Sequence, residues 1–590
     1  MEAGKKQIND IFNSNRILEV PYFQRSYVWT ERQWERFLED METISANNKP
    51  YFLGSIILKQ KLTSSDSSIG DIRMIIDGQQ RLTTLQIFFR VLGIKTANNA
   101  LLNSLFRLPF NNNELAMHHN HNDESMFNKV MNLLTLDDLS KNQDNISKAY
   151  TYFKNNIDPS KLDSQIILNN ILFVGIDVQQ NEDEQQIFDT INSIGVSLST
   201  AELLKNYFFN RDYKAYQTYW EDIFEKDDDT KAYWDKKINA GRFNRSLIDL
   251  FFSAYLQIAI QDISGIQKSG STYPQKVSAS DKQEFAKVES LFLSYKKFIK
   301  DYDIDQNKII TDIKEYAEIF KNNIDPTITE KDLVCHAGID RINDLIFGLD
   351  NTTLIPYFIY ILRNQPNQTL QNELFDYIEK YIMRRLICQT SNKNYNNFFT
   401  ESCILNKCLT KNDFEKISTT NGNVNDMPSK IQIQSALENT IYYNKIATGI
   451  LYFIESKTRS NPQQGTSLLG INKYSLEHMM PKKWRNNWGL LANDTLNKQR
   501  DNILLTIGNL TIITQSLNAS IRDDSWTNKL NGKNNNGLIK YASGINITTP
   551  YLSKQIWDEN EIINRTKDIY KLAIDFWKIP DDANVTTKWD

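Results

Sequence analysis

The stretch Met74-Ile75-Ile76-Asp77-Gly78-Gln79-Gln80-Arg81-Leu82-Thr83-Thr84-Leu85 decides the fold of the first part of the chain. Its apolar start predicts a strand, and the residues from Leu82 onward have the periodicity of a helix. An acid, a glycine, two amides and an arginine lie between the two, where the N–H groups and dipole of a helix N-terminus favour phosphate. The stretch therefore predicts either a phosphate-binding turn or a solvated strand-to-helix turn capped by Asp77.

The residue types of this turn suit a nucleotide. Gly78 allows close approach of the backbone, and Arg81 can direct two donors at phosphate oxygens. Asp77 with Gln79 and Gln80 could position a metal-bound water or a ribose hydroxyl. The sequence has neither a glycine-rich loop ending in Gly-Lys-Ser/Thr nor a GxGxxG fingerprint. If the protein binds a nucleoside triphosphate (NTP), whether GTP, ATP or another, it must therefore bind it at this turn.

Three further blocks accompany this turn in order along the chain: residues 20–29, 52–58 and 186–199. Their order and spacing resemble the N-terminal domain of GmrSD-type modification-dependent (type IV) restriction endonucleases, the group that also contains the SspE and BrxU proteins. The resemblance implies a ParB-like, nucleotide-hydrolysing α+β domain whose active centre is that turn. Gln24 and Arg25 would then line the nucleotide pocket or a sensor of modified bases. The alternative is a structural loop that ties the first strand to its neighbours.

Length and patterning predict several domains. A chain of 590 residues exceeds what one hydrophobic core normally supports. Residues 1–210 mix strand-like runs with helical periodicity, residues 211–446 have the long charged-and-apolar segments of helices, and residues 447–590 return to strand-like and loop-like patterning. We therefore predict an α+β multidomain fold in which a helical domain joins the two ends. In the first region, the pattern predicts strands at 55–58, 74–76 and 171–178 and helices at 34–44, 82–92 and 201–209.

Composition excludes several classes of protein. The formal net charge of −4 and the pI of about 5.9 argue against a generally basic DNA coat, although a local basic groove can still bind DNA. The four cysteines are too few and too irregularly spaced for a disulfide framework, and they complete no zinc site. No apolar run has the length of a signal peptide core or a bilayer span. We expect a soluble, cytoplasmic protein that does not contact a membrane.

The last part of the chain carries a second candidate site in three segments, residues 474–481, 504–513 and 518–522. An acid–histidine pair closes one predicted strand, and a Gly-Asn turn enters a second. Asn518 opens a predicted helix that runs to about Leu530. Such a strand–strand–helix arrangement can bring side chains from all three segments around one metal ion.

These segments resemble an HNH (ββα-metal) nuclease of the type that is fused to the GmrSD N-terminal domain. The resemblance implies that Glu477 is an acidic metal ligand and that His478 is the general base. It also implies that Asn509 ties the loop so that the base faces its water, and that Asn518 is the third motif residue and a second metal ligand. Oxygen ligands favour Mg²⁺ or Mn²⁺ over zinc. Without this context His478 would be an ordinary capping or surface histidine.

Cations near this motif are candidate DNA contacts. Lys482, Lys483 and Arg485 surround Trp484 directly after the acid–histidine strand, and Lys529 lies late in the predicted helix. They could hold phosphates that flank a cleavage site. The alternative for the first three is a solvated turn.

Together the two ends predict an NTP-regulated, modification-dependent DNA endonuclease that acts against phage through a metal-dependent HNH site. Its expected partners are modified phage DNA and a nucleoside triphosphate, and formation of a homo-oligomer stays open. One alternative is a nucleotide-switched DNA-binding regulator with an inactive HNH-like tail. Another is an RNA-directed abortive-infection nuclease with the same chemistry.

Overall fold

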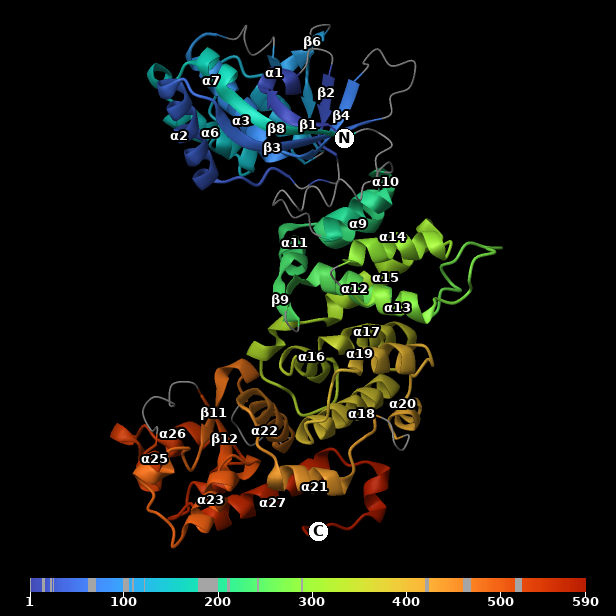
Figure 1. Ribbon diagram of the computed structural model, residues 1–590, viewed down its shortest axis with the longest axis vertical. Coiled ribbons are helices and arrows are strands. Elements are labelled where there is room, and N and C mark those ends of the chain that lie inside the picture. Colours follow the sequence, from blue (N-terminus) through green and yellow to red (C-terminus); the bar gives the residue numbers. More distant parts are fainter. Residues whose placement is uncertain are drawn as a thin grey trace. The chain divides into compact units, whose positions relative to one another are not determined.

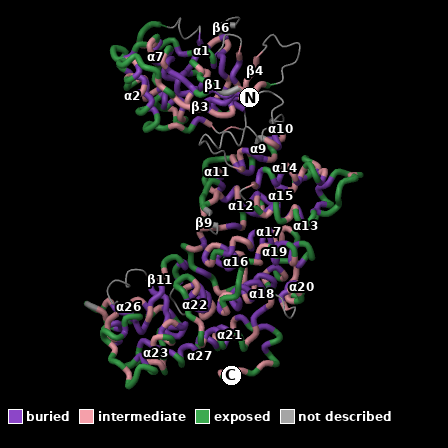
Figure 2. Tube along the Cα trace, viewed as in Figure 1, coloured by how far each residue is buried: buried purple, intermediate pink, exposed green. Residues whose placement is uncertain are grey.

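The computed structural model describes residues 2–12, 16–21, 24, 26–61, 71–98, 105–108, 111–120, 122–178, 200–209, 213–240, 243–287, 290–419, 424–459, 468–514 and 523–590. The chain forms two compact units, Met1–Thr218 and Tyr219–Asp590. Buried residues are concentrated inside each unit (Figure 2). Within the described ranges, no helix has the length and apolar character needed to span a bilayer.

The first unit is built on a six-stranded mixed sheet (Figure 1). The strand order is β1-β8-β3-β4-β2-β7; β3 is antiparallel to β4 and parallel to β8. The strands are β1 (Glu2–Gln7), β2 (Arg16–Glu19), β3 (Tyr51–Gln60), β4 (Asp71–Asp77), β7 (Met117–His118) and β8 (Ile171–Val178), with a separate pair β5 (Arg107–Leu108) and β6 (Asn111–Leu115). The helices are α1 (Ile8–Ile11), α2 (Glu31–Asn47), α3 (Gln79–Lys95), α5 (Glu124–Met131), α6 (Asn145–Asn156), α7 (Ser164–Asn170), α9 (Thr200–Phe209) and α10 (Tyr213–Tyr216).

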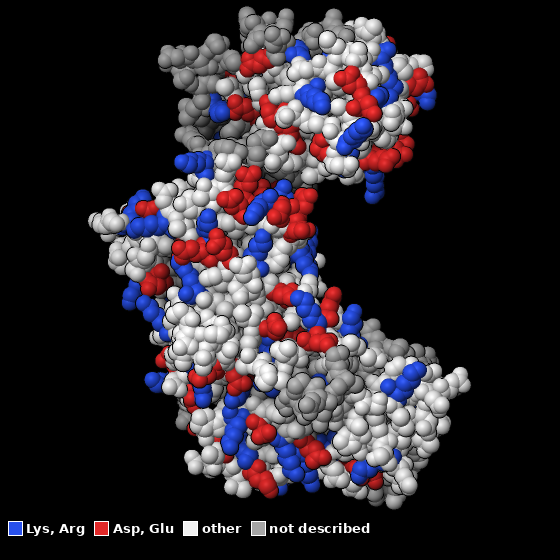
Figure 3. Space-filling view, turned by 180° about the vertical axis from the view of Figure 1, so that it is seen from behind, with Lys and Arg blue, Asp and Glu red and all other residues white. Residues whose placement is uncertain are grey.

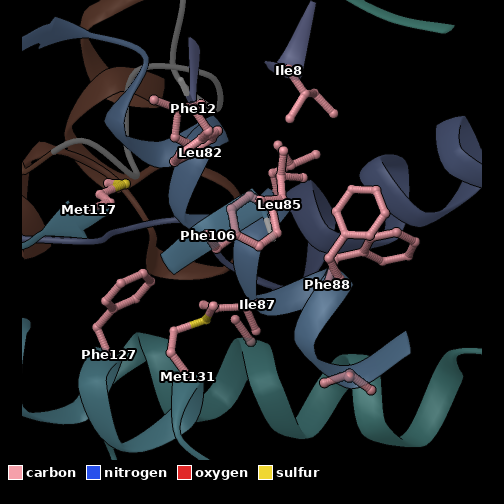
Figure 4. Packing of buried hydrophobic residues seen from close by; sticks show 14 of the residues in the cluster. Ile8, Phe12, Leu82, Leu85, Ile87, Phe88, Phe106, Met117, Phe127 and Met131 are labelled. Carbon is pink, nitrogen blue, oxygen red and sulfur yellow. The ribbon is translucent and has the colours of Figure 1, made fainter. Parts of the chain in front are cut away.

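Helix α3 is the core element of this unit, because its apolar residues surround the helix instead of forming one stripe. Its Ile87 lies beside Phe127 and Met131 of α5, and its Leu85 and Phe88 lie in the same buried cluster on the other side of the helix (Figure 4). The strand predicted at 74–76 and the helix predicted at 82–92 are confirmed as parts of β4 and α3. The core therefore holds the Asp77–Arg81 turn between a half-buried strand and a buried helix.

The second unit is mainly helical. The region expected to be helical contains α11 (Asp228–Asp235), α12 (Leu247–Ala259), α13 (Ala279–Phe285), α14 (Leu291–Asp301), α15 (Gln306–Asn323), α16 (Ile339–Phe347), α17 (Ile355–Asn364), α18 (Gln368–Ile387), α19 (Tyr395–Asn397), α20 (Lys411–Ser418) and α21 (Lys430–Asn439). It also contains a short antiparallel hairpin that the sequence pattern did not predict, formed by β9 (Lys237–Ala240) and β10 (Phe243–Ser246).

The tail differs from its predicted strand-like and loop-like character. Its described residues form one two-stranded sheet, β11 (Tyr474–His478) with β12 (Leu510–Thr514), and the helices α22 (Asn444–Thr458), α23 (Asp494–Ile503), α25 (Trp526–Asn531), α26 (Leu538–Ala542) and α27 (Glu559–Phe576). Buried residues of α27, such as Ile562, Ile569 and Ala573, recur at helical spacing. The many polar residues between them hid this period. The predicted domain boundary at 446/447 falls inside α22, and the division into three domains stays a prediction.

Two buried arginine–carboxylate pairs connect the helical region with the end of the chain. Arg384 of α18 binds both carboxylate oxygens of Asp582, at 2.7 and 2.9 Å. Arg341 of α16 binds both oxygens of Glu379, at 2.5 and 2.8 Å, and the indole N–H of Trp577 donates to the same carboxylate at 3.0 Å. Such bidentate pairs fix geometry as well as charge. They hold α16, α18 and the residues after α27 together.

Asp344 of α16 is a buried carboxyl group with no hydrogen-bond partner on either oxygen among the described residues. Burial raises its pKa to about 7; nearby Arg341 opposes the shift and Glu379 adds to it. Because the folded-state pKa lies above the unfolded value, the folded protein keeps the proton, and stability falls as the pH rises from about 4 to about 7.

We therefore expect Asp344→Asn to stabilise the second unit at pH 8 by about 2–4 kcal/mol and to change little at pH 4. Thermal unfolding of both proteins at the two pH values measures this. An equal shift of the midpoint at pH 4 and pH 8 would contradict the titration of Asp344.

Candidate functional site

The first candidate site is the turn between β4 and α3. Gly78 has φ 101°, a left-handed conformation that favours glycine, and it lets α3 begin directly after Asp77. The Ser55 hydroxyl of β3 donates to Asp77 Oδ2 at 3.0 Å. Arg81 Nη2 donates to the Ser55 carbonyl at 2.5 Å and to Asp77 Oδ2 at 3.1 Å. Asp77 and Arg81 therefore bind each other, and both also bind Ser55 of the neighbouring strand β3.

A second glycine leaves room for this arrangement. Gly54 of β3 has φ 135°, and a Cβ there would lie 3.0 Å from Arg81 Nε. Among the described residues, only Nη2 of the Arg81 guanidinium makes hydrogen bonds. Because Nε is buried against Gly54, Nη1 is the part of the guanidinium left for another acceptor.

The amides of this region hold backbone segments together. Gln80 accepts from the Val28 N–H at 2.8 Å and donates to the Ser26 carbonyl at 3.3 Å. Gln24 donates to the carbonyls of Ile75 and Ile76, at 2.6 and 3.1 Å. These contacts of Gln24 and Gln80 are the ones expected if residues near Gln24 form a structural loop that is tied to the neighbouring strand and turn. Gln79 is buried, whereas Arg25 and the predicted block at 186–199 lie outside the described residues.

The second candidate site lies where β11 ends. β11 and β12 pair antiparallel with Glu477 opposite Thr511 and His478 opposite Leu510, so the two predicted strands are confirmed. The helix that was predicted to run from Asn518 to about Leu530 is not continuous, because residues 523–525 are not helical and α25 covers Trp526–Asn531. Residues 523–525 precede it, with the Asp523 and Asp524 carbonyls bound by the Asn487 amide and the Trp488 indole. Asn518 itself lies outside the described residues.

Asn509 is fully buried and uses both ends of its amide. Its Oδ1 accepts from the Met480 N–H at 2.7 Å and from the Trp557 indole at 2.9 Å. Its Nδ2 donates to the carbonyls of Met480 and Leu504, at 2.7 and 2.8 Å. The amide thus fixes the backbone two residues after His478, and it is not exposed to a substrate.

The turn around Asn509 is itself held by α27. Arg565 is completely buried, and its Nη1 donates to the Gly508 and Leu510 carbonyls, at 2.9 and 2.6 Å. A Cβ on Gly508 would lie 2.1 Å from Thr566 Oγ1, so only glycine fits against the helix here. The sequence pattern did not identify Arg565, because no motif links it to residues more than fifty positions earlier.

His478 is half-buried, and among the described residues its ring makes no hydrogen bond. Burial lowers its pKa to about 4, and the positive charges of Lys482 and Lys529 add to the effect. The imidazole is therefore neutral at pH 7 and can accept a proton.

Glu477 and Lys529 form a buried ion pair that changes two predicted roles. Lys529 Nζ donates to Glu477 Oε1 at 2.5 Å and to the His478 carbonyl at 2.5 Å. The Lys529 side chain is 0% exposed, so the prediction that it contacts DNA is wrong for this structure. Glu477 does not fit the role of metal ligand here, because a bound ammonium repels a second cation at the same carboxylate. No group of three acidic, histidine or cysteine side chains in the described ranges could hold a metal ion.

The other predicted DNA contacts lie nearer the surface. Lys482 and Lys483 are exposed. Arg485 is partly exposed, binds both oxygens of Asp501 and lies over the Trp484 ring at 4.4 Å. On the face that Figure 3 shows, basic and acidic side chains are interspersed. A DNA contact through local cations such as Lys482 and Lys483 fits this distribution of charge.

Comparison with known protein families gives two matches. Residues 8–209 match the family model of the GmrSD restriction endonuclease N-terminal domain, and residues 427–572 match that of the GmrSD restriction endonuclease C-terminal domain. Together they cover more than half of the chain, with the N-terminal domain model matched before the C-terminal domain model. No curated protein matched the chain. The first match contains the Asp77–Arg81 turn, and the second contains His478 and Asn509.

Proposed function

The chain belongs to the GmrSD restriction endonucleases, and from this membership we propose that it is a modification-dependent DNA endonuclease of the HNH type that acts against phage. The two family domains support a restriction nuclease. The single observation that supports the HNH chemistry is the neutral, half-buried His478 at the end of a two-stranded sheet whose following turn is held by Asn509.

In this proposal His478 takes a proton from the water that attacks the phosphodiester. Asn509 holds the Met480 backbone, so that the segment after His478 keeps one conformation. Lys482 and Lys483 bind phosphates beside the cleavage site. We propose Mg²⁺ or Mn²⁺ as the cofactor, which would neutralise charge on the phosphate, with Asn518 as the remaining predicted ligand.

Cleavage of supercoiled plasmid tests the nuclease directly. We would incubate the purified chain with unmodified, hydroxymethylated, glucosylated and phosphorothioated plasmid, with Mg²⁺, Mn²⁺ or EDTA, and with and without each NTP. Metal-dependent cleavage of a modified form supports the proposal. Binding without cleavage would support the nucleotide-switched regulator, which the occupied carboxylate of Glu477 favours. Cleavage of a matched RNA alone would support the RNA-directed nuclease.

We further propose that the first unit is a ParB-like NTPase whose centre is the Asp77–Arg81 turn. The support is Arg81 Nη1, which makes no hydrogen bond to the described residues, beside the N-terminus of α3, where phosphate is favoured. Gly78 allows the backbone to approach the nucleotide, while Gln24 and Gln80 support the turn from the neighbouring segments.

Asp77→Ala and Arg81→Ala should each reduce NTP hydrolysis at least about 100-fold, because each removes a charged group from the proposed centre. Phosphate release from GTP and ATP measures this. Arg32→Ala, at an exposed position of α2, is the matched control and should leave turnover unchanged. Unchanged turnover in folded Asp77 and Arg81 variants would refute the site.

A further inference from the structure

We propose that Lys529 is a positioning residue of the nuclease site. From α25 it donates hydrogen bonds to Glu477 and to the His478 carbonyl at the end of β11, and so fixes the orientation of the His478 side chain. The inference rests on the proposed nuclease function. It gives Lys529 and Glu477 a joint role in place of separate roles in DNA binding and metal binding.

The geometry places Lys529 behind the histidine. Successive side chains of a strand point to opposite faces, so Glu477 and His478 project away from each other. Lys529 Nζ binds Glu477 Oε1 and the His478 carbonyl at the same time, each at 2.5 Å. One ammonium therefore holds both a side chain and the backbone at the point where the His478 ring leaves the strand. The His478 ring itself makes no hydrogen bond to the described residues.

The ammonium itself is held in place by tight burial. Lys529 is 0% exposed and Glu477 is 5% exposed. Burial lowers the pKa of Lys529 and raises that of Glu477, and the attraction between the two opposes both shifts. A buried ion pair of this kind adds little net stability compared with apolar residues, but removing one partner leaves an unpaired buried group. The Lys529–Glu477 ion pair therefore fits a role in fixing the local geometry better than a role in stabilising the fold.

Helix α25 carries Lys529 on a rigid support. Trp526 stacks on Trp557 with ring centroids 5.4 Å apart and an angle of 26° between the planes. The Trp557 indole donates to Asn509 Oδ1 at 2.9 Å. Asn509 thus holds the backbone after His478, while Lys529 holds the carbonyl of His478 itself. Both supports meet in one packed network around the catalytic candidate.

Three full-length variants test this role: Lys529→Met, Glu477→Gln and the double variant. Each single variant leaves a buried charged group without its charged partner and should lower the unfolding temperature. The double variant removes both buried charges but leaves a neutral amide at position 477 and the His478 carbonyl without the Lys529 donor, so it should recover part of that temperature. It still lacks the donor to the His478 carbonyl, so its kcat should stay about 10- to 100-fold below that of the unchanged protein, with KM for DNA unchanged.

Glu477→Gln alone keeps that donor and should lose less kcat than Lys529→Met. The assay uses the plasmid form that the unchanged protein cleaves best, well below every unfolding temperature. Recovery of kcat together with unfolding temperature in the double variant would show that Lys529 is merely structural and would overturn the proposal. So would a raised half-saturating Mn²⁺ concentration in Glu477→Gln, because it would make Glu477 a metal ligand. Absence of cleavage by the unchanged protein would instead refute the nuclease function.

Discussion

Replacement of His478 by alanine is expected to abolish DNA cleavage, with a loss of about 10²- to 10⁴-fold in rate, while the protein stays folded. The imidazole is neutral at pH 7 because burial lowers its pKa to about 4, so it is ready to accept the proton of an attacking water. Among the described residues its ring makes no hydrogen bond, so its removal leaves no hydrogen-bond partner unpaired there. Conversion of supercoiled plasmid into nicked and linear forms measures the loss.

The matched control is His336→Ala, an exposed histidine of the same unit, which should cleave at the unchanged rate. NTP hydrolysis by His478→Ala should also equal that of the unchanged protein, because its proposed site lies in the other unit. Persistent strand scission by a purified, folded His478→Ala protein would show that another group is the base. A parallel loss of NTP hydrolysis would point to general misfolding instead.

Replacement of Asn509 by alanine should produce the largest loss of stability, about 3–5 kcal/mol, because it leaves several buried backbone and indole groups without partners. The four hydrogen bonds of this amide connect the Met480 backbone, the Leu504 carbonyl and the Trp557 indole. Cleavage should fall with it, since the segment that follows His478 loses its support. Hydrogen-exchange mass spectrometry of the peptide that contains Met480 measures the local opening.

Asn497→Ala is the matched control for this variant. Asn497 is also a buried asparagine of the tail, but its side chain makes a single hydrogen bond, from the Leu491 N–H at 3.0 Å. We expect its loss to cost about 1 kcal/mol. Equal exchange protection around Met480 in the two variants would mean that the Asn509 network does not hold this turn.

Local patterns were read well from the sequence because neighbouring residues decide them. The apolar run before Asp77 and the glycine after it suffice to predict a strand, a tight turn and a helix, and the structure has β4, Gly78 and α3 there. The same holds for β11 and β12, whose alternating apolar residues lie within two short segments.

The sequence could not predict interactions that depend on distant packing. A lysine beside a DNA-binding motif suggests an exposed phosphate contact, and only the position of α25 shows that Lys529 is buried against Glu477. Residues 523–525 were also predicted wrongly as part of a helix, because the hydrogen bonds from Asn487 and Trp488 to residues 523 and 524 are not visible in a local pattern. The predicted site residues Asn518 and Arg25 lie outside the described residues.

The buried partners of α18 make the proposed nuclease end of this protein a poor candidate for dissection into a smaller fragment. A cut at the predicted boundary would divide α22 and separate Arg384 from Asp582 and Glu379 from Trp577. Each fragment would then contain charged groups without the partners that neutralise them in the interior of the intact protein, at a cost of several kcal/mol. A shortened nuclease for laboratory use should therefore start near Tyr219 and keep every residue to the C-terminus.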